Sequence, residues 1–265
     1  MKTLIAFVCV LAAACGQDQE DLDKRIVNGE PVTTSPYTFL ASLQIFDANS
    51  GEWHHHCGAE LIEPDKLLTA AHCVAGRDSW RWRVVLGVTS IHPSKLQNGQ
   101  IERVKSFIVH PDYDPLDFYN NDIAIVYLDR RVRYNKKIKP AKLAFKYSSY
   151  VGSKCVVTGW GDTETKKASG TYDLMHAHVT KISNQVCQHL YPYAKIRRTN
   201  LCLFEENEPA GSRPDACQGD SGGPVMCGAN LQDLAGITSW GVDCGAHHPG
   251  VYTRVSEFLD WIHTN

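Results

Sequence analysis

One glycine-rich segment constrains this chain more than any other. Residues 215–225 read Asp-Ala-Cys-Gln-Gly-Asp-Ser-Gly-Gly-Pro-Val, which places Ser221 directly after an acid and between two glycine-containing stretches. A serine hydroxyl is a weak nucleophile, and it needs a nearby base and hydrogen-bond donors for the oxyanion that forms on attack. Glycine lets the backbone approach a substrate, so the N–H groups of Gly219 and Ser221 can share one small space. The segment predicts a nucleophilic serine, with a glycine-rich surface turn as the alternative.

Two further segments complete a catalytic set. Residues 68–73 read Leu-Thr-Ala-Ala-His-Cys and end with His72 beside a cysteine. Residues 121–128 read Asn-Asp-Ile-Ala-Ile-Val-Tyr-Leu, where Asp122 opens an alternating, β-branched stretch typical of a strand. Taken singly, such a histidine is more often a core or loop residue, and such an acid more often forms a turn. Together with Ser221 they supply a base, an orienting acid and a nucleophile in the order of the chymotrypsin triad.

Other motifs follow in order and carry a family resemblance. They are Ile-Val-Asn-Gly at 26–29, Val-Thr-Gly-Trp-Gly at 157–161, Ser-Trp-Gly at 239–241 and Pro-Gly-Val-Tyr at 249–252. With these motifs, the chain from residue 26 to residue 265 resembles the chymotrypsin-fold serine peptidases, specifically the trypsin-like branch. The resemblance implies an all-β fold of two antiparallel six-stranded β-barrels with a C-terminal helix, and an active site between the barrels.

The hydrophobic pattern agrees with this fold class. Short alternating stretches separated by turn residues predict strands at 38–46, 56–62, 66–69, 81–87, 100–109 and 123–128. Apolar residues recur at helical spacing between 255 and 262, with Ser256 as the expected N-cap. The resemblance places the N-terminal barrel at about 26–140, the C-terminal barrel at about 141–252 and the helix at about 254–265.

The first residues, about 1–16, fit a secretory signal peptide. Lys2 precedes an apolar run at 4–11 and a string of small residues. The run is too short to span a bilayer. Cleavage is expected after Cys15 or Gly16, whereas a cut after Ala14 would leave Cys15 in the product. We therefore expect a secreted, extracellular protein.

Residues 17–25 are acidic and end in a basic pair, just before an apolar Ile-Val. The resemblance implies an activation peptide that is cut after Arg25. In the family, the freed amine, here that of Ile26, turns inward and pairs with the acid before the nucleophile, here Asp220. Burial of an ammonium and a carboxylate is costly unless the two meet. One cut would then assemble the oxyanion hole and the specificity pocket.

The ten cysteines indicate an oxidising compartment. Eight of them lie beyond the signal region, and sequence alone allows 105 ways to pair eight cysteines. The resemblance selects four pairs, which are Cys57 with Cys73, Cys155 with Cys227, Cys187 with Cys202 and Cys217 with Cys244.

The resemblance also assigns the substrate-binding residues. Asp215 matches the floor of the primary specificity pocket, where an acid selects a cationic side chain. Gly241 and Gly250 match the pocket walls. Ala216 stands where many relatives carry a serine that helps bind lysine, so arginine is expected to be preferred over lysine.

Further positions shape the neighbouring surface. Tyr119 matches the next subsite and is expected to favour a small residue there. Ser239, beside Trp240, matches a residue that supports the triad acid and the substrate backbone, and Trp240 is also expected to bind substrate. Asp243 departs from the family, which usually has glycine there, so the pocket rim is expected to be distorted or more negative.

Charge and ligand patterns exclude other functions. The net charge of −2 argues against a nucleic-acid or polybasic membrane partner. The run His54-His-His56 offers two histidines on one strand face, which is too few for zinc, and residues 88–94 lack the acids of a calcium loop. We expect no metal and no cofactor. Expected partners are protein or peptide substrates, an activating protease and protein protease inhibitors, with a monomeric enzyme.

These patterns predict a secreted serine endopeptidase, made as a zymogen, that cleaves after Arg or Lys by acyl transfer through Ser221, His72 and Asp122. Since His72 must be neutral to act as a base, activity is expected to fall at acid pH. The alternative from another class is a catalytically silent homologue that acts as a binding module. An elastase-like preference is a second alternative, and Asp215 disfavours it.

Overall fold

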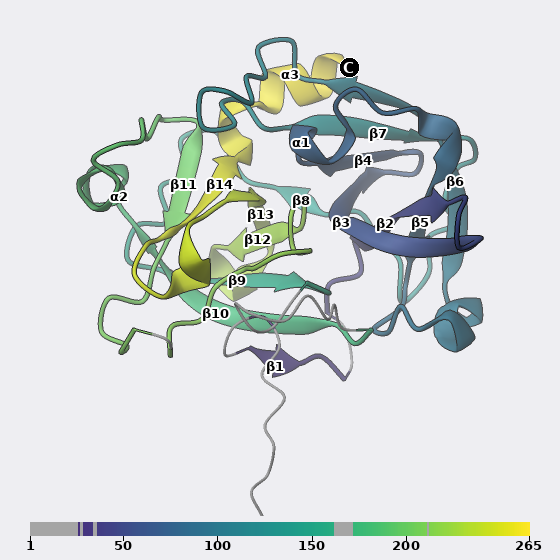
Figure 1. Ribbon diagram of the computed structural model, residues 1–265, viewed down its shortest axis with the longest axis horizontal. Coiled ribbons are helices and arrows are strands. Elements are labelled where there is room, and N and C mark those ends of the chain that lie inside the picture. The colour runs from purple at the N-terminus through teal and green to yellow at the C-terminus, as the bar shows by residue number, and fades with distance from the viewer. Residues whose placement is uncertain (1–25, 27–28, 34–35, 162–171, 211) are drawn as a thin grey trace, which may run out of the picture.

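Six strands close into a barrel in the first half of the chain (Figure 1). The computed structural model describes residues 26, 29–33, 36–161, 172–210 and 212–265. The barrel pairs its strands antiparallel in the order β2-β3-β4-β7-β6-β5. Its strands are β2 (Leu40–Asp47), β3 (Glu52–Glu63), β4 (Lys66–Thr69), β5 (Trp82–Leu86), β6 (Gln100–Val109) and β7 (Ala124–Leu128).

A second barrel closes because β9 pairs with both β12 and β10, in the ring β10-β11-β14-β13-β12-β9. Its strands are β9 (Lys154–Gly159), β10 (Met175–Ile182), β11 (Asn200–Leu203), β12 (Pro224–Cys227), β13 (Asp233–Trp240) and β14 (Gly250–Arg254). Two short strands extend this sheet, β1 (Glu30–Pro31) beside β10 and β8 (Lys142–Leu143) parallel to β13. The predicted all-β fold of two six-stranded barrels is therefore confirmed.

The predicted strands match the observed ones to different degrees. The predictions for β4 and β6 are exact, whereas β3 begins at Glu52 instead of residue 56. The histidine-rich start of β3 pairs with the end of β2, where Gln44 lies opposite His55 and Ile45 opposite His54. A polar stretch thus joins the sheet because its partner strand is long.

In the described part of the chain, three short α-helices accompany the barrels: α1 (Ala71–Val74), α2 (Asn184–Leu190) and α3 (Leu259–Thr264). The same residues contain five 3₁₀ turns: η1 (Ser79–Arg81), η2 (Pro93–Asn98), η3 (Ala229–Leu231), η4 (Asp243–Gly245) and η5 (Val255–Glu257). The prediction that Ser256 caps the C-terminal helix is wrong. Ser256 lies within η5, its buried hydroxyl has no hydrogen-bond partner, and Phe258 precedes α3.

The helix α3 returns the end of the chain to the first barrel (Figure 1). Buried Lys66 of β4 donates a hydrogen bond to the carbonyl of Ile262, at 2.6 Å. A cation at the last turn of a helix meets carbonyls that have no partner within the helix. This bond therefore links the C-terminal helix to the N-terminal barrel.

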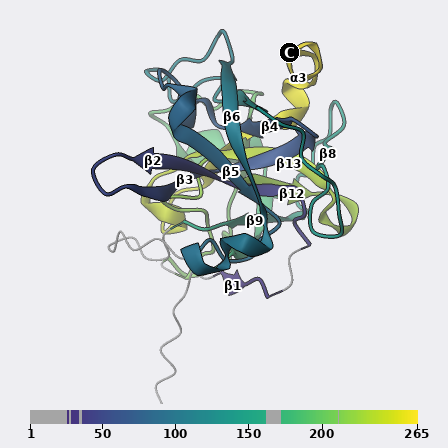
Figure 2. The same cartoon turned by 90° about the vertical axis from the view of Figure 1, so that its right-hand side faces the viewer.

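The two barrels touch through glycines. A Cβ atom on Gly58 of β3 would lie 2.6 Å from the Cα of Gly223. Any residue larger than glycine at this position would therefore clash with the backbone of the second barrel. Figure 2 is viewed from the side of the first barrel, with β5 and β6 in front of strands of the second. The four disulfides among the described residues each join segments of the same half of the chain: Cys57–Cys73 in the first, and Cys155–Cys227, Cys187–Cys202 and Cys217–Cys244 in the second.

Glu60 of β3 is a buried acid inside this fold. Its side chain is 0% exposed, and neither carboxyl oxygen has a hydrogen-bond partner. Burial raises the pKa of Glu60 well above its ordinary value. The folded state therefore holds a neutral carboxyl that the unfolded chain would ionise.

Replacement of Glu60 by glutamine should reduce the pH dependence of stability. Because its folded pKa is raised, the contribution of Glu60 is complete below the unfolded pKa and is lost as the pH rises through the folded one. Urea unfolding between pH 4 and pH 8 should show Glu60→Gln gaining on the parent by up to about 1.4 kcal/mol per pH unit. Parallel curves for the two proteins would contradict this reading.

Candidate active site

Asp122 lies at the entry to β7 and is held by donors from both barrels. Its side chain is 1% exposed. Oδ1 accepts the backbone N–H of His72 at 2.9 Å, and Oδ2 lies 2.7 Å from His72 Nδ1. The hydroxyl of Ser239, from β13 of the second barrel, donates to Oδ2 at 2.6 Å. Since an ionised carboxylate only accepts, His72 Nδ1 carries the proton and Nε2 presents a lone pair.

His72 is positioned by its short helix and its neighbours. It lies in α1 next to Cys73, whose disulfide to Cys57 ties α1 to β3. The ring of Tyr119 meets the imidazole edge-on, with ring centroids 5.4 Å apart. Its environment leaves the imidazole few alternative orientations, which is what a general base requires.

Ser221 is pinned against the first barrel. Its carbonyl accepts the N–H of Gly58 at 2.8 Å, and the next residue, Gly222, has a φ of +74°. A Cβ atom on Gly222 would lie 2.3 Å from Thr69 Oγ1, so this close crossing also requires glycine. The segment that carries the serine is thus fixed by backbone contact with the opposite barrel.

Ser221 and His72 line one cavity of about 300 Å³. Within the described residues, no hydrogen bond joins the Ser221 hydroxyl to His72. Such bonds are often long in free enzymes and tighten with substrate. The structure therefore brings the predicted nucleophile, base and acid together at the junction of the barrels.

The backbone around Ser221 offers donors for an oxyanion. Gly219 has a φ of +90°, a conformation suited to glycine. Among the described residues, the N–H groups of Gly219 and Ser221 donate to no protein acceptor, so both are available to a ligand. The geometry suits the predicted oxyanion hole.

Buried His55 supports the Gly219 peptide from behind. Its Nε2 lies 3.0 Å from the Gly219 carbonyl and its Nδ1 lies 2.8 Å from Ser42 Oγ. Burial lowers the pKa of His55 to about 4, so the ring is neutral and has one donor. A carbonyl only accepts, hence Nε2–H donates to Gly219 and Nδ1 accepts the Ser42 hydroxyl. The sequence pattern alone did not indicate this support of the oxyanion hole.

Asp220 turns into the protein. Its carboxylate accepts the N–H groups of Gly161 and Cys217, each at 2.9 Å. Ile26 is fully buried and packs in the core of the second barrel with residues such as Val157. Arg25, at the predicted cut, lies outside the described residues, as do the signal and activation peptides.

Asp215 lies at the bottom of the active-site cavity. It is 3% exposed, and its Oδ1 accepts the Tyr252 hydroxyl at 2.8 Å and the Ala216 N–H at 2.9 Å. Burial, the largest cause, raises the pKa of Asp215 to about 7. Such a carboxyl gains strongly from a cation that enters the cavity.

The cavity walls explain two glycines. A Cβ atom on Gly250 would lie 2.5 Å from Asp215 Oδ1, whereas one on Gly241 would approach the protein only at Gly250, 3.8 Å away. The ring of Trp240 forms one side of the cavity and packs against Tyr191, with centroids 5.0 Å apart. Backbone and ring groups of both walls thus line a slot that contains the Asp215 carboxyl.

Asp243, the departure at the rim, is hydrogen-bonded by its neighbours. Its carboxylate lies 3.2 Å from His247 Nδ1 and 3.1 Å from His248 Nδ1, and it also accepts the His247 N–H. Hydrogen bonds from these residues lower the pKa of Asp243. Asp243 and Cys244 both have positive φ, of +58° and +44°. The sequence signal for this cluster was the His-His pair shortly after Cys244.

Neither metal ligation nor a membrane span is indicated by the described residues. The one group of ligand-type residues close enough for an ion is Cys57, His72 and Cys73, and both cysteines are used in a disulfide. His56, from the histidine run, instead packs edge-on against Trp82. No described helix is long and apolar enough to cross a bilayer.

Comparisons with known proteins agree with this architecture. The trypsin family model matches residues 26–262. Human kallikrein-5 is 34% identical over 256 residues, covering 95% of this chain and 80% of the relative. Trypsin II-P29 of Gallus gallus is 35% identical over 265 residues, covering 99% and 97%. The structure of neuropsin, described as a serine protease expressed in the limbic system of mouse brain, matches with a TM-score of 0.75 and 33% identity, over 90% of this chain and 99% of that chain.

The raised pKa of Asp215 predicts a pH-dependent pocket. Above pH 7 the carboxyl is ionised and should bind a cation fully, while below pH 7 protonation competes with binding. The affinity for benzamidine, a flat cation, should then fall by up to about tenfold per pH unit. Calorimetry on chain cut at residue 25 and carrying Ser221→Ala would measure this. An affinity that stays constant from pH 8 to pH 5 would contradict the prediction.

Proposed function

Because the chain belongs to the trypsin family and is a trypsin-like serine endopeptidase, we propose that it is a secreted zymogen which, once cut after Arg25, cleaves peptide bonds after arginine and less readily after lysine. Enzymes of this family act on protein substrates and are regulated by protein inhibitors. The observation that carries the proposal is the buried Asp215 carboxyl at the bottom of the cavity that His72 and Ser221 line.

The proposed chemistry is acyl transfer. His72 Nε2 takes the proton of the Ser221 hydroxyl as the oxygen attacks the substrate carbonyl, and the N–H groups of Gly219 and Ser221 stabilise the oxyanion. Asp122 holds the imidazole in the tautomer with Nδ1–H and stabilises its positive charge. His72 then protonates the leaving amine, which breaks the peptide bond and leaves an acyl-enzyme. Water, activated by His72, releases the acid product and restores Ser221.

The preference for a cationic residue follows from solvation. Asp215 is buried with two neutral donors, so a guanidinium or ammonium in the slot removes the cost of an isolated charge. Arginine can reach the carboxylate with its planar fork. Ala216 offers no hydroxyl to a shorter lysine ammonium, which supports the order arginine before lysine.

The zymogen proposal depends on the Ile26 amine. That amine exists only after cleavage, and the inward position of Asp220 suits a buried ion pair with it. A paired amine has a raised pKa, so its stabilisation is complete below the unfolded value of about 8 and is lost as the pH rises through the folded value. This would give activity an alkaline limit.

Specificity is tested by changing the pocket floor. Asp215→Ser should lower kcat/KM for arginine esters by about a hundredfold or more, because the cation loses its buried partner. Esters of small apolar residues provide the matched control and should lose little. Retained preference for arginine would refute the pocket assignment.

Covalent labelling tests both the proposed activation by a cut after Arg25 and the role of Ser221 as the nucleophile. The full chain should react with a fluorophosphonate only after a cut at residue 25, and the variants Arg25→Gln, which resists that cut, and Ser221→Ala should stay unlabelled. If the cut parent chain did not react at all, the catalytically silent alternative would be correct. Equal labelling of parent and Arg25→Gln without cutting would disprove the activation step.

A further inference from the structure

The loop between β6 and β7 carries two aromatic residues in a backbone conformation that such residues rarely adopt. Phe118 and Tyr119 have φ of +49° and +52°, in the left-handed region. Residues other than glycine are disfavoured there, so this backbone persists only where surrounding contacts fix it. The N–H and carbonyl groups of Asp114 and Asn120 bond each other, both at 3.0 Å. These bonds fix the base of the turn and leave its tip to be held by other contacts.

An ion pair between the barrels holds the tip. Arg197, in the segment between α2 and β11, donates from Nη2 to the Asp117 carboxylate. Its Nη1 donates to the Lys195 carbonyl at 3.0 Å, and its backbone N–H donates to Asn200 Oδ1 at 2.8 Å. An exposed ion pair contributes little when both side chains are mobile. The Arg197 side chain is only 19% exposed and is already held by its own segment, so the pair links Asp117 to the second barrel.

Phe118 directly follows Asp117 and lies against Trp240 of the second barrel. The two ring centroids are 5.7 Å apart, and the ring planes are tilted by 42°. Phe118 is nevertheless 38% exposed, and Trp240 lines the active-site cavity together with Tyr119. The two tilted rings therefore offer an apolar surface at the edge of that cavity.

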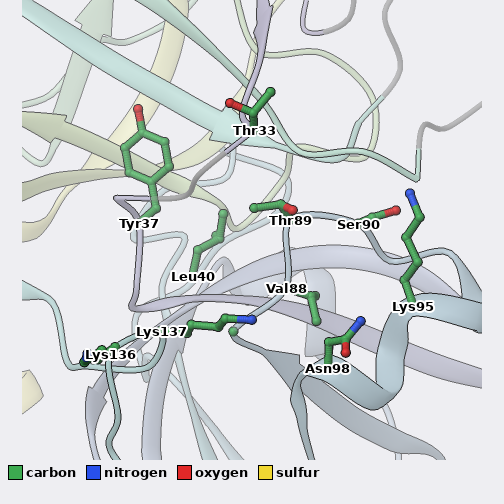
Figure 3. Close-up of a pocket in the computed structure, with 11 residues that line it drawn as sticks. Thr33, Tyr37, Leu40, Val88, Thr89, Ser90, Lys95, Asn98, Lys136 and Lys137 are labelled. Carbon is green, nitrogen blue, oxygen red and sulfur yellow. The ribbon is translucent and has the colours of Figure 1, made fainter.

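The cavity of about 500 Å³ beside the first barrel does not offer such a surface. It shares no described lining residue with the active-site cavity. Figure 3 shows its lining, in which Tyr37 is the one aromatic side chain among the described residues and Lys95, Lys136 and Lys137 lie around the space. A substrate side chain close to the cleaved bond therefore meets the two rings and not this cavity.

We propose that Arg197 is a positioning residue for substrate selection. Through Asp117 it holds Phe118 against Trp240, and the two rings bind an apolar side chain, best an aromatic one, of a residue that precedes the arginine. This inference rests on the proposed cleavage after arginine. Tyr119 is assigned to the residue directly before the arginine, so the rings receive a side chain two or three places before it. A ring packs well on both faces, whereas a polar side chain would lose water there without gaining a hydrogen bond.

Fluorogenic peptide amides that all end in arginine test this on the chain cut at residue 25. Acetyl-Phe-Gly-Gly-Arg and acetyl-Gly-Phe-Gly-Arg place the ring at the two positions, acetyl-Gly-Gly-Gly-Arg is the reference, and glutamine in place of phenylalanine is the polar control. One phenylalanine substrate should exceed the reference in kcat/KM by about tenfold, mainly through a lower KM, and the glutamine substrates should match the reference. Equal values for phenylalanine and glutamine would overturn the inference. No cleavage of the reference would instead refute the proposed function.

Variants of the ion pair test the positioning role. Arg197→Gln and Asp117→Ala should each lower the ratio of the phenylalanine substrate to the reference by about two- to fivefold, and the double variant by no more, because both act through one contact. Arg198→Gln changes the charge equally and removes the neighbouring ion pair with Glu257, and it should leave the ratio unchanged. Inhibition by benzamidine should stay constant throughout. An unchanged ratio in Arg197→Gln, an equal loss in Arg198→Gln or weaker benzamidine inhibition would each overturn the role.

Phe118→Ala should remove the preference for phenylalanine. Leu116→Ala is the matched apolar control, since Leu116 lies in the same loop and is 94% exposed, and it should keep the preference. Faster cleavage of the phenylalanine substrates by Phe118→Ala would show that this ring covers the surface of Trp240 instead of binding substrate, and it would overturn the inference.

Discussion

The structure of this active site depends on the buried Asp122 carboxylate. The first barrel supplies it at the entry to β7, and it receives donors from His72 on the same barrel and from Ser239 on the other. The hydroxyl of Thr253, in β14, also donates to the Asp122 carbonyl, at 2.7 Å. A buried carboxylate is tolerated only when hydrogen bonds replace the water it has lost. The packing of the two barrels and the orientation of His72 both supply such hydrogen bonds to Asp122.

Three buried acids illustrate how their surroundings set their chemistry. Asp122 has donors from two barrels and orients a base. Asp220 is held by the backbone N–H groups of Gly161 and Cys217. Asp215 accepts two hydrogen bonds and has a raised pKa, and it lines a cavity in which a substrate cation can bind its carboxylate. Glu60 differs from all three because its oxygens lack partners, and it carries a pH-dependent cost to stability.

Local patterns predicted much of the fold and of the candidate site. Alternation placed β4 and β6 to the residue, and the glycine-rich segment around Ser221 pointed to close backbone contacts, which the crossings at Gly58 and Gly222 explain. Features that depend on distant partners could not be predicted in this way. Ser256 has the chemistry of a cap, but packing against the barrel buries it in a 3₁₀ turn. The role of His55 depends on a carbonyl 164 residues away in sequence.

The central claim is that His72 and Ser221 act as one unit across the junction of the barrels. A double-mutant cycle on kcat/KM for an arginine ester measures this directly, with His72→Ala, Ser221→Ala and the two combined. Residues that act in the same step lose activity together, so the double variant should be about as active as either single variant. If the two losses multiplied in the double variant, the two side chains would act independently and the proposed triad would be wrong.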